Sequence, residues 1–239
     1  SVVPFMAAAY LVMAVIALAL NFADLGETFA LIFDGAFNPQ SAVGGFTGAA
    51  IIMAIRAGVA RGLFSNEAGQ GSTPIAHAVA QTDDPEQQGR MAMLGTFIDT
   101  VVICTMTALV ILTVRGDFTA GGEAVAHAWQ SDRVGFEMTS GAFAAAFPVE
   151  IASIPIGTLI ASIALLLFVF TTLLTWSYYG ERCCEYLFGV KSIFAFKISW
   201  IVVVFGGAFV LMLEEGGAVT DVVSLFWLLA DTLTGLMAA

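Results

Sequence analysis

Charged residues are scarce in this chain. Asp, Glu, Lys and Arg together make up 11% of its 239 residues, while 59% are hydrophobic and the mean hydropathy is +0.92. Soluble domains usually carry about 25% charged residues. A chain so poor in charge could not cover a folded surface with groups that water favours, which excludes an ordinary soluble globular protein. We therefore expect much of its surface to contact lipid.

Basic residues and cysteines are scarce as well. Eight Lys and Arg stand against 19 Asp and Glu, so that the formal net charge is −11. This balance excludes a nucleic-acid-binding surface and disfavours a peripheral protein held by anionic lipid. The three cysteines are Cys104, Cys183 and Cys184, and the sequence has no CxxC motif or Cys/His cluster. Neither a disulfide framework, nor a cysteine-based metal site, nor an organic cofactor is predicted.

Long apolar runs are abundant. They cover residues 2–20, 42–60, 91–114, 155–179, 196–213 and 222–239. About 20 helical residues span the hydrocarbon core of a bilayer. Backbone groups in lipid need internal partners, and these runs are too long and continuous for β-barrel strands, so they must be helices. We predict an all-α, multi-pass protein of a cell membrane (plasma or inner), with about six passages in a single transmembrane domain over residues 1–239.

The connectors between these runs are more polar. Residues 21–40 contain three acidic and no basic residues, and within them residues 25–37 predict a short amphipathic helix at the membrane surface. Residues 115–154 form a mixed connector. Basic residues place the loops 81–90 and 180–197 in the cytoplasm. The chain starts at Ser1 close to one apolar run and ends at Ala239 inside another. We therefore expect it to be part of a longer protein.

Residues 62–80 interrupt the apolar pattern. Gly62, Gly69, Gly71 and Pro74 weaken a helix, and the polar side chains among them compete for backbone hydrogen bonds. This composition predicts a spanning helix that is broken near the middle of the bilayer, with an ordinary surface loop as the alternative. Half-helix ends offer N–H groups to a carboxylate and carbonyl groups to a cation. A zwitterionic amino acid that binds together with sodium needs both.

Glu67 is the most costly group in this stretch. A carboxylate near the centre of a membrane is unfavourable by roughly 2.5–3.5 kcal/mol, so it usually has a role. It could bind a cation, carry a proton or cap the following half-helix, and the structural alternative is an ion pair with Arg61 or Arg56. We interpret His77 as a packing residue. A serine hydrolase built on Ser72 and His77 is disfavoured, because Pro74 lies between them and no GxSxG motif is present.

A second polar group lies near the end of the fourth run. At helical spacing, Thr171, Thr175 and Tyr178 share one face, and Thr172, Trp176 and Tyr179 share the neighbouring face. Hydroxyl oxygens suit sodium, and an indole can form an apolar wall and donate one hydrogen bond. The alternative is helix–helix contact with an interfacial aromatic belt, which we favour for Tyr178 and Tyr179.

Asp99 is a third candidate, because a carboxylate within a predicted span is a functional candidate. Thr100, Cys104 and Thr107 lie on one stripe of the same helix, at i, i+4 and i+7. We interpret these three residues as packing residues.

Three stretches, in order, resemble the alanine or glycine:cation symporter family. They are Gly62-Leu-Phe-Ser-Asn-Glu-Ala-Gly69 with its continuation to His77, Gly95-Thr-Phe-Ile-Asp-Thr100, and Trp176-Ser-Tyr-Tyr-Gly-Glu-Arg182. The resemblance implies a leucine-transporter-like inverted repeat, of which this chain would supply the fifth to tenth core helices. Residues 62–71 would be the second broken helix. The first broken helix would lie in the N-terminal helices of the full-length transporter, which we expect as partners.

The resemblance also implies a function, namely sodium-coupled symport of small neutral amino acids (alanine or glycine) by alternating access, without enzymatic chemistry. The expected substrate-binding residues are Phe64, Ser65, Asn66, Gly69, Gln70, Thr172 and Trp176. Thr171 is the expected contact for the co-transported sodium ion, and Glu67 and Asp99 are further coupling candidates. The alternatives are a proton-coupled amino acid permease, with Glu67 or Asp99 carrying the proton, and a membrane fragment that does not transport.

Overall fold

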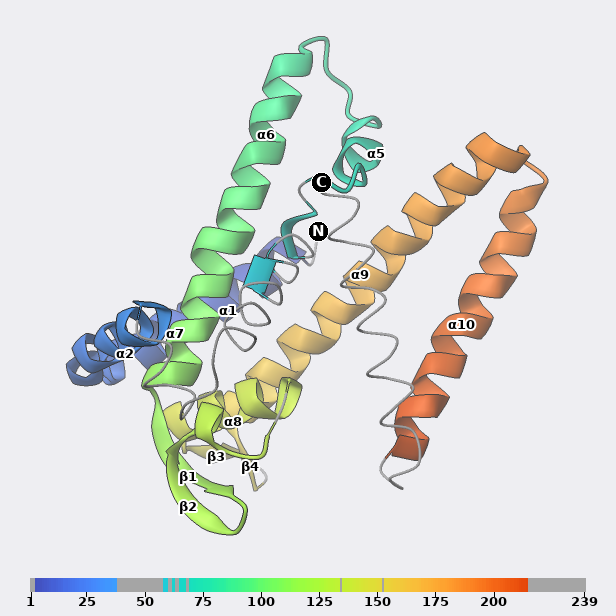
Figure 1. Cartoon of the computed structure of the whole chain (residues 1–239). Coiled ribbons are helices and arrows are strands. Elements are labelled where there is room, and N and C mark those ends of the chain that lie inside the picture. Colours follow the sequence, from blue (N-terminus) through green and yellow to red (C-terminus); the bar gives the residue numbers. More distant parts are fainter. Residues whose placement is uncertain are drawn as a thin grey trace. The chain divides into compact units, whose positions relative to one another are not determined.

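The computed structural model, drawn as a ribbon in Figure 1, describes residues 3–37, 58–59, 62, 65–67, 69–133, 135–151 and 153–214. Its contacts divide the chain into two compact units. Unit 1 comprises Ser1–Ile51 and Ile98–Thr171, and unit 2 comprises Ile52–Phe97 and Thr172–Ala239. The predicted runs at 42–60 and 222–239 lie outside the described residues.

Unit 1 begins with two helices joined by a sharp bend. The helix α1 (Val3–Leu20) is followed by the short 3₁₀ helix η1 (Phe22–Asp24) and by α2 (Leu25–Phe37). The chain turns by 76° between Pro4–Leu20 and Phe22–Gly35. At the bend, the Asn21 side-chain amide donates to the Ala17 carbonyl at 2.8 Å, which satisfies one of the carbonyls left open at the helix end. The helix predicted over residues 25–37 is confirmed.

The predicted span at 91–114 is also confirmed as helical, and it begins earlier. It consists of α6 (Pro85–Phe97), the π-helical segment η2 (Ile98–Cys104) and α7 (Thr105–Thr113). Directly after η2, the Thr105 hydroxyl of α7 donates to the Thr100 carbonyl at 3.5 Å, five residues earlier. A π-helix has more residues per turn than an α-helix. The α-helical spacing on which the stripe of Thr100, Cys104 and Thr107 was based therefore does not apply over Ile98–Cys104.

The connector between the third and fourth runs contains strands that the all-α prediction did not include. The strands β1 (Arg115–Ala120) and β2 (Glu123–His127) form an antiparallel hairpin. Its turn residues Gly121 and Gly122 have φ values of +57° and +87°, which suit a two-residue hairpin loop. After the 3₁₀ helix η3 (Ala128–Gln130) come α8 (Phe136–Ala146) and a second ribbon of β3 (Glu150–Ile151) and β4 (Ile154–Pro155).

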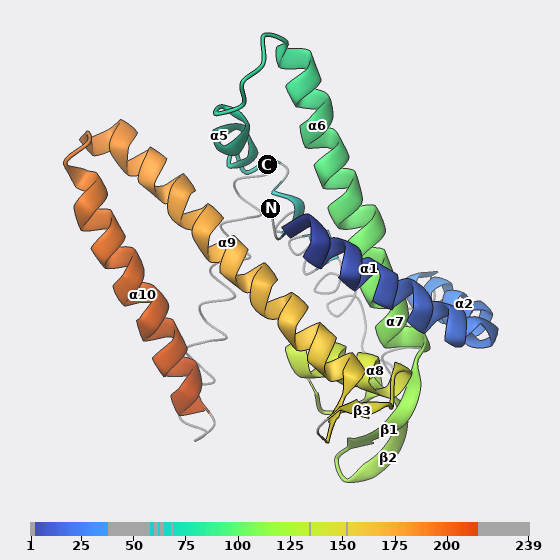
Figure 2. The ribbon, with the colours of Figure 1, turned by 180° about the vertical axis from the view of Figure 1, so that it is seen from behind.

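The core of unit 1 lies where α1 packs against α7 and α8 (Figure 2). Tyr10 of α1 meets Phe143 and Phe168 edge-on, with ring centroids 5.5 Å and 6.0 Å away. Its hydroxyl lies 2.7 Å from the Thr107 hydroxyl of α7. Small side chains allow this close packing, because Ala14, Ala17 and Ala142 are fully buried. Between helices in a membrane, close van der Waals packing and interhelical hydrogen bonds of this kind are the stabilising terms.

Two long helices complete the described chain. The helix α9 (Ile156–Phe188) begins in unit 1 and ends in unit 2, and α10 (Ser192–Glu214) follows after a turn at Gly189 with φ +80°. They confirm the helices predicted at 155–179 and 196–213. Near the turn, the Ser192 hydroxyl donates to the Cys184 carbonyl at 3.0 Å.

Among the described residues, three helices are long and apolar enough to cross a membrane. They are Pro85–Thr113, Ile156–Phe188 and Ser192–Phe209, and the bent pair of α1 and α2 would make a fourth if it counts as one span. Only 6%, 17% and 0% of their respective most apolar windows are buried inside the protein. Exposed apolar surfaces of this size are unfavourable in water and mark a surface that contacts lipid or other protein. The chain is therefore a multi-pass membrane protein.

Candidate functional site

Between Asn66 and Thr73, three of the described residues leave the right-handed helical conformation. Ser65 and Asn66 are helical, and then Glu67 has φ +58°. Gly69 and Gly71 follow with φ +80° and +78°. A left-handed conformation is easy for glycine but unfavourable for a glutamate. The described residues thus include non-helical backbone, as both interpretations of residues 62–80 require, and a spanning helix broken within the bilayer stays a prediction.

The helix resumes at α5 (Thr73–His77), with Pro74 in its first turn. Proline is well accommodated there, because the first N–H groups of a helix have no intrahelical partner. Before α5, the backbone N–H of Gln70 donates to the backbone carbonyl of Glu67 at 3.2 Å and closes a turn.

Two hydroxyl groups bind the Glu67 carboxylate. The Ser72 hydroxyl donates to its Oε2 atom at 2.7 Å, and the Tyr179 hydroxyl of α9 forms a second side-chain hydrogen bond with it. Ser72 and Tyr179 are only 9% and 8% exposed. From the sequence we expect helix–helix or interfacial contact for Tyr179 and no part in the substrate or coupling site for Ser72. One sequence feature could have indicated a role for Tyr179, namely the helical face that it shares with the candidate substrate residues Thr172 and Trp176.

Trp176 adjoins this group. Its ring meets the Tyr179 ring edge-on, with centroids 6.2 Å apart. The helix α9 is continuous here, so that Thr172 and Trp176 lie one turn apart, and Thr172 is exposed. The neighbouring Tyr178 ring lies beneath the Arg182 guanidinium at 5.3 Å, and its centroid is 6.5 Å from that of Tyr179.

The other substrate-site candidates fall in different places. Phe64 lies outside the described residues, and Arg61 and Arg56, the possible ion-pair partners of Glu67, do so too. Ser65, Asn66, Gly69 and Gln70 all belong to unit 2, as do Thr172 and Trp176.

The coupling candidates Asp99 and Thr171 belong to unit 1. Asp99 lies in the π-helical segment, where the Thr100 hydroxyl donates to its carboxylate at 3.5 Å. The Thr171 hydroxyl donates its hydrogen to the Phe168 carbonyl at 2.9 Å. Within the described part of the chain, no three His, Cys, Asp or Glu side chains are grouped so that they could hold a metal ion.

Ser72 and His77 do not form a nucleophile–base pair. The hydroxyl hydrogen of Ser72 goes to Glu67, and the Nδ1 atom of His77 is hydrogen-bonded with the Gln88 amide. An activated serine requires a base that accepts its proton and is itself oriented by a third group. The contacts around His77 fit the packing role predicted for it.

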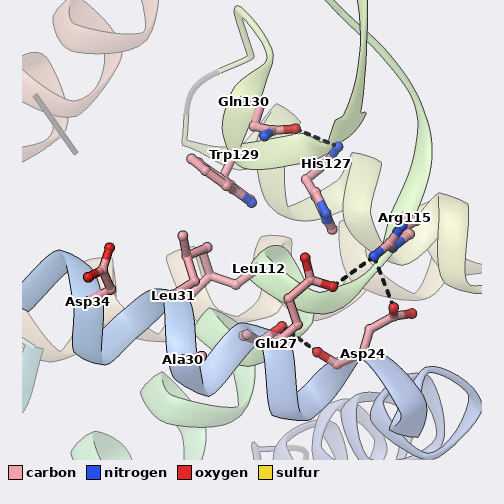
Figure 3. A pocket seen from close by; sticks show the side chains of 11 residues that line it. Asp24, Glu27, Ala30, Leu31, Asp34, Leu112, Arg115, His127, Trp129 and Gln130 are labelled. Atoms are coloured by element: carbon pink, nitrogen blue, oxygen red, sulfur yellow. Dashed lines mark hydrogen bonds and ion pairs between the residues drawn. The ribbon is translucent and has the colours of Figure 1, made fainter. Parts of the chain in front are cut away.

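A separate pocket of about 420 Å³ lies in unit 1, between α2 and the segment from β1 to η3 (Figure 3). The Arg115 guanidinium at the start of β1 contacts the carboxylates of Asp24 and Glu27, each at 3.1 Å. The His127 ring stacks on Trp129 at 6.2 Å. The positive charge of Arg115 is therefore balanced by two acidic residues of the connector 21–40. These ion pairs link the β1–β2 hairpin to η1 and α2.

Comparison with known proteins gives a consistent result. The model of the sodium:alanine symporter family matches residues 1–239. The chain is 41% identical over 237 residues to the sodium/alanine symporter AgcS of Methanococcus maripaludis, covering 99% of this chain and 46% of that protein. An uncharacterized transporter of Haemophilus influenzae is 40% identical over 238 residues, with coverage of 99% and 46%.

A third relative is the sodium/proton-dependent alanine carrier protein of Bacillus sp. strain PS3, which is 33% identical over 214 residues, or 86% of this chain and 46% of that protein. The chain thus spans about half the length of the curated relatives it matches. No solved structure matches the chain significantly.

Proposed function

The chain belongs to the sodium:alanine symporter family, and from this premise we propose that the full-length protein imports small neutral amino acids, alanine or glycine, together with sodium. The observation that carries the proposal is the left-handed backbone at Glu67, Gly69 and Gly71, which belong to the same unit as Thr172 and Trp176 of α9. Broken helices in secondary transporters supply backbone N–H and carbonyl groups to substrate and ion.

The proposed substrate site combines this break with one face of α9. Phe64, Ser65, Asn66, Gly69 and Gln70 would surround the ammonium and carboxylate groups of the amino acid. Thr172 and Trp176 would face its side chain, and the bulk of the indole would favour a small one. Amide and hydroxyl groups suit a zwitterion because they both donate and accept hydrogen bonds without adding net charge.

We place the sodium contact at Thr171, whose hydroxyl oxygen is a ligand of the kind that hard cations prefer. Sodium and substrate would bind jointly and stabilise an occluded state, so that the sodium gradient drives uptake by alternating access. We further propose the leucine-transporter-like repeat for the full-length protein, with its N-terminal helices completing the site, in the plasma or inner membrane.

A proton-coupled permease is the second candidate, with Glu67 or Asp99 as the proton carrier. The family description favours sodium. One relative is named a sodium/proton-dependent carrier, so the test below also asks whether a proton gradient drives uptake.

The test is uptake of radiolabelled alanine into proteoliposomes that contain the full-length protein. We expect uptake to require an inward sodium gradient and to fall by at least roughly tenfold in Asn66→Ala, because a hydrogen bond to a charged group contributes about 1.5–3 kcal/mol. The control is Gln81→Ala, which removes an exposed amide outside the proposed site. Uptake that follows a proton gradient instead would favour the permease. Uptake that survives Asn66→Ala unchanged would place the substrate site elsewhere.

A further inference from the structure

We propose that Tyr179 and Ser72 are positioning residues, which hold Glu67 and thereby keep the broken segment in the shape that binds substrate. This inference rests on the proposed function. It assigns Glu67 the part of an internal anchor for the segment, in place of the cation-binding or proton-carrying parts that the sequence left open.

The backbone of Glu67 needs such an anchor. Its φ of +58° is unfavourable for a residue with a Cβ atom, and it persists only where the surroundings enforce it. The nearby Gly69 and Gly71 also have positive φ, and glycine has wide conformational freedom. Their backbone therefore does little to hold Glu67 in its left-handed conformation. A side chain that is fixed at its far end restricts the whole turn.

Ser72 provides the local half of the anchor. It lies at the other end of the turn, directly before α5, and its hydroxyl reaches the Glu67 carboxylate at 2.7 Å. This bond closes the segment from Glu67 to Ser72 into a ring through side chains. A charge-assisted hydrogen bond of this kind is shorter and stronger than a neutral one.

Tyr179 provides the distant half. It comes from α9, 112 positions further along the chain, and its buried hydroxyl bonds to the same carboxylate. Its ring also meets Trp176 edge-on at 6.2 Å. The tyrosine therefore contacts both halves of the proposed substrate site, the turn that carries Asn66 and Gly69 and the helix face that carries Trp176.

The expected consequence is kinetic. When only a fraction of molecules holds the segment in its binding shape, the apparent affinity for substrate falls by that fraction. Loss of one hydroxyl should therefore raise the KM for alanine more than it lowers the maximal rate.

The experiment measures sodium-driven alanine uptake by the full-length protein in proteoliposomes. We expect Tyr179→Phe and Ser72→Ala each to raise the KM at least threefold and to change the maximal rate less than twofold. Ser72→Thr, which keeps the hydroxyl, should stay within twofold of the wild-type KM. The matched control is Tyr186→Phe, whose tyrosine is on the same helix and 89% exposed. An unchanged KM in Tyr179→Phe overturns the inference.

A second measurement separates an anchor from mere packing. In a Glu67→Ala background, Tyr179→Phe should have no further effect on the KM, or on the midpoint of thermal unfolding where uptake is too slow to measure. An equal effect in both backgrounds overturns the inference, since Tyr179 would then act without Glu67. Wild-type protein that shows no sodium-driven uptake would overturn the proposed function, while the unfolding midpoints would still report whether Tyr179 acts through Glu67.

Discussion

Gly157, in the first turn of α9, lies directly against the backbone of Phe143 in α8. A Cβ atom at position 157 would be 1.9 Å from the Phe143 carbonyl oxygen and 2.4 Å from its carbonyl carbon. Both atoms belong to the main chain of a helix, so neither can move aside as a flexible side chain would. The contact lets α9 start against the core of unit 1, where Phe143 is fully buried.

We expect Gly157→Ala to destabilise the protein by about 1–3 kcal/mol or more, because overpacking a tight contact forces backbone shifts. The measurement is the midpoint of thermal unfolding of the purified protein in detergent. Gly206→Ala in α10 is the control, since a Cβ atom there meets nothing within 4 Å. That change should be neutral or stabilising by up to about 1 kcal/mol. Equal midpoints for the two variants would contradict the contact.

Thr28 and Thr113 form a buried hydroxyl pair between α2 and α7. The Thr113 hydroxyl donates to the Thr28 hydroxyl at 3.0 Å, and Thr28 in turn donates to the Asp24 carbonyl at 3.1 Å. Thr113→Val removes one hydrogen bond, and we expect it to cost about 0.5–1.5 kcal/mol. Thr28→Val leaves the fully buried Thr113 hydroxyl without its acceptor and should cost more, about 1–3 kcal/mol.

The double variant tests whether this pair is real. Once Thr28 is valine, the added cost of Thr113→Val should shrink or change sign, because no bond is left to break. Unfolding free energies of the four proteins give the coupling directly. Strictly additive effects would mean that the two hydroxyls do not depend on each other.

Glu181 joins α9 to α10. Its carboxylate lies 3.1 Å from the Lys197 amine and 3.0 Å from the Arg182 guanidinium, and its side chain is 15% exposed. We expect Glu181→Gln to lower the midpoint of thermal unfolding, because a neutral amide loses the charge-assisted contacts with both cations. Lys197→Gln should cost less, because Lys197 is 53% exposed and Glu181 keeps Arg182. Thermal unfolding that ranks the two variants in the opposite order would refute this assignment.

Arg115 contacts two carboxylates, but all three side chains are substantially exposed to solvent. Their exposed fractions are 52% for Arg115, 32% for Asp24 and 77% for Glu27. Exposed ion pairs contribute about 0.2–1 kcal/mol and weaken with salt. We therefore expect Arg115→Gln to lower stability by no more than about 1 kcal/mol at low ionic strength, with the difference shrinking at about 1 M salt, where the screening length is about 3 Å. A large, salt-independent loss would mean that Arg115 acts through packing.

The amino-acid sequence by itself determined the class of this protein and most of its described helices. An apolar run of about 20 residues is a local property of the sequence. In lipid such a run forms a helix, because its backbone groups need hydrogen-bond partners within the segment. For the same reason the break after Asn66 could be predicted, since glycine and proline act on their own turn of backbone. The Gly121–Gly122 hairpin carried an equally local signal, which the reading of residues 115–154 as a mixed connector missed.

Only the tertiary structure decided which side chains meet. The sequence favours a packing role for Tyr179, because nothing in its own helix reveals that its hydroxyl forms a hydrogen bond with Glu67, which is distant in the sequence. The π-helical turn at Ile98–Cys104 likewise altered a stripe drawn at α-helical spacing. The contact of Gly157 with Phe143 depends on how two helices approach each other. Such contacts join segments far apart in the chain, so local composition and spacing do not encode them, whereas packing does.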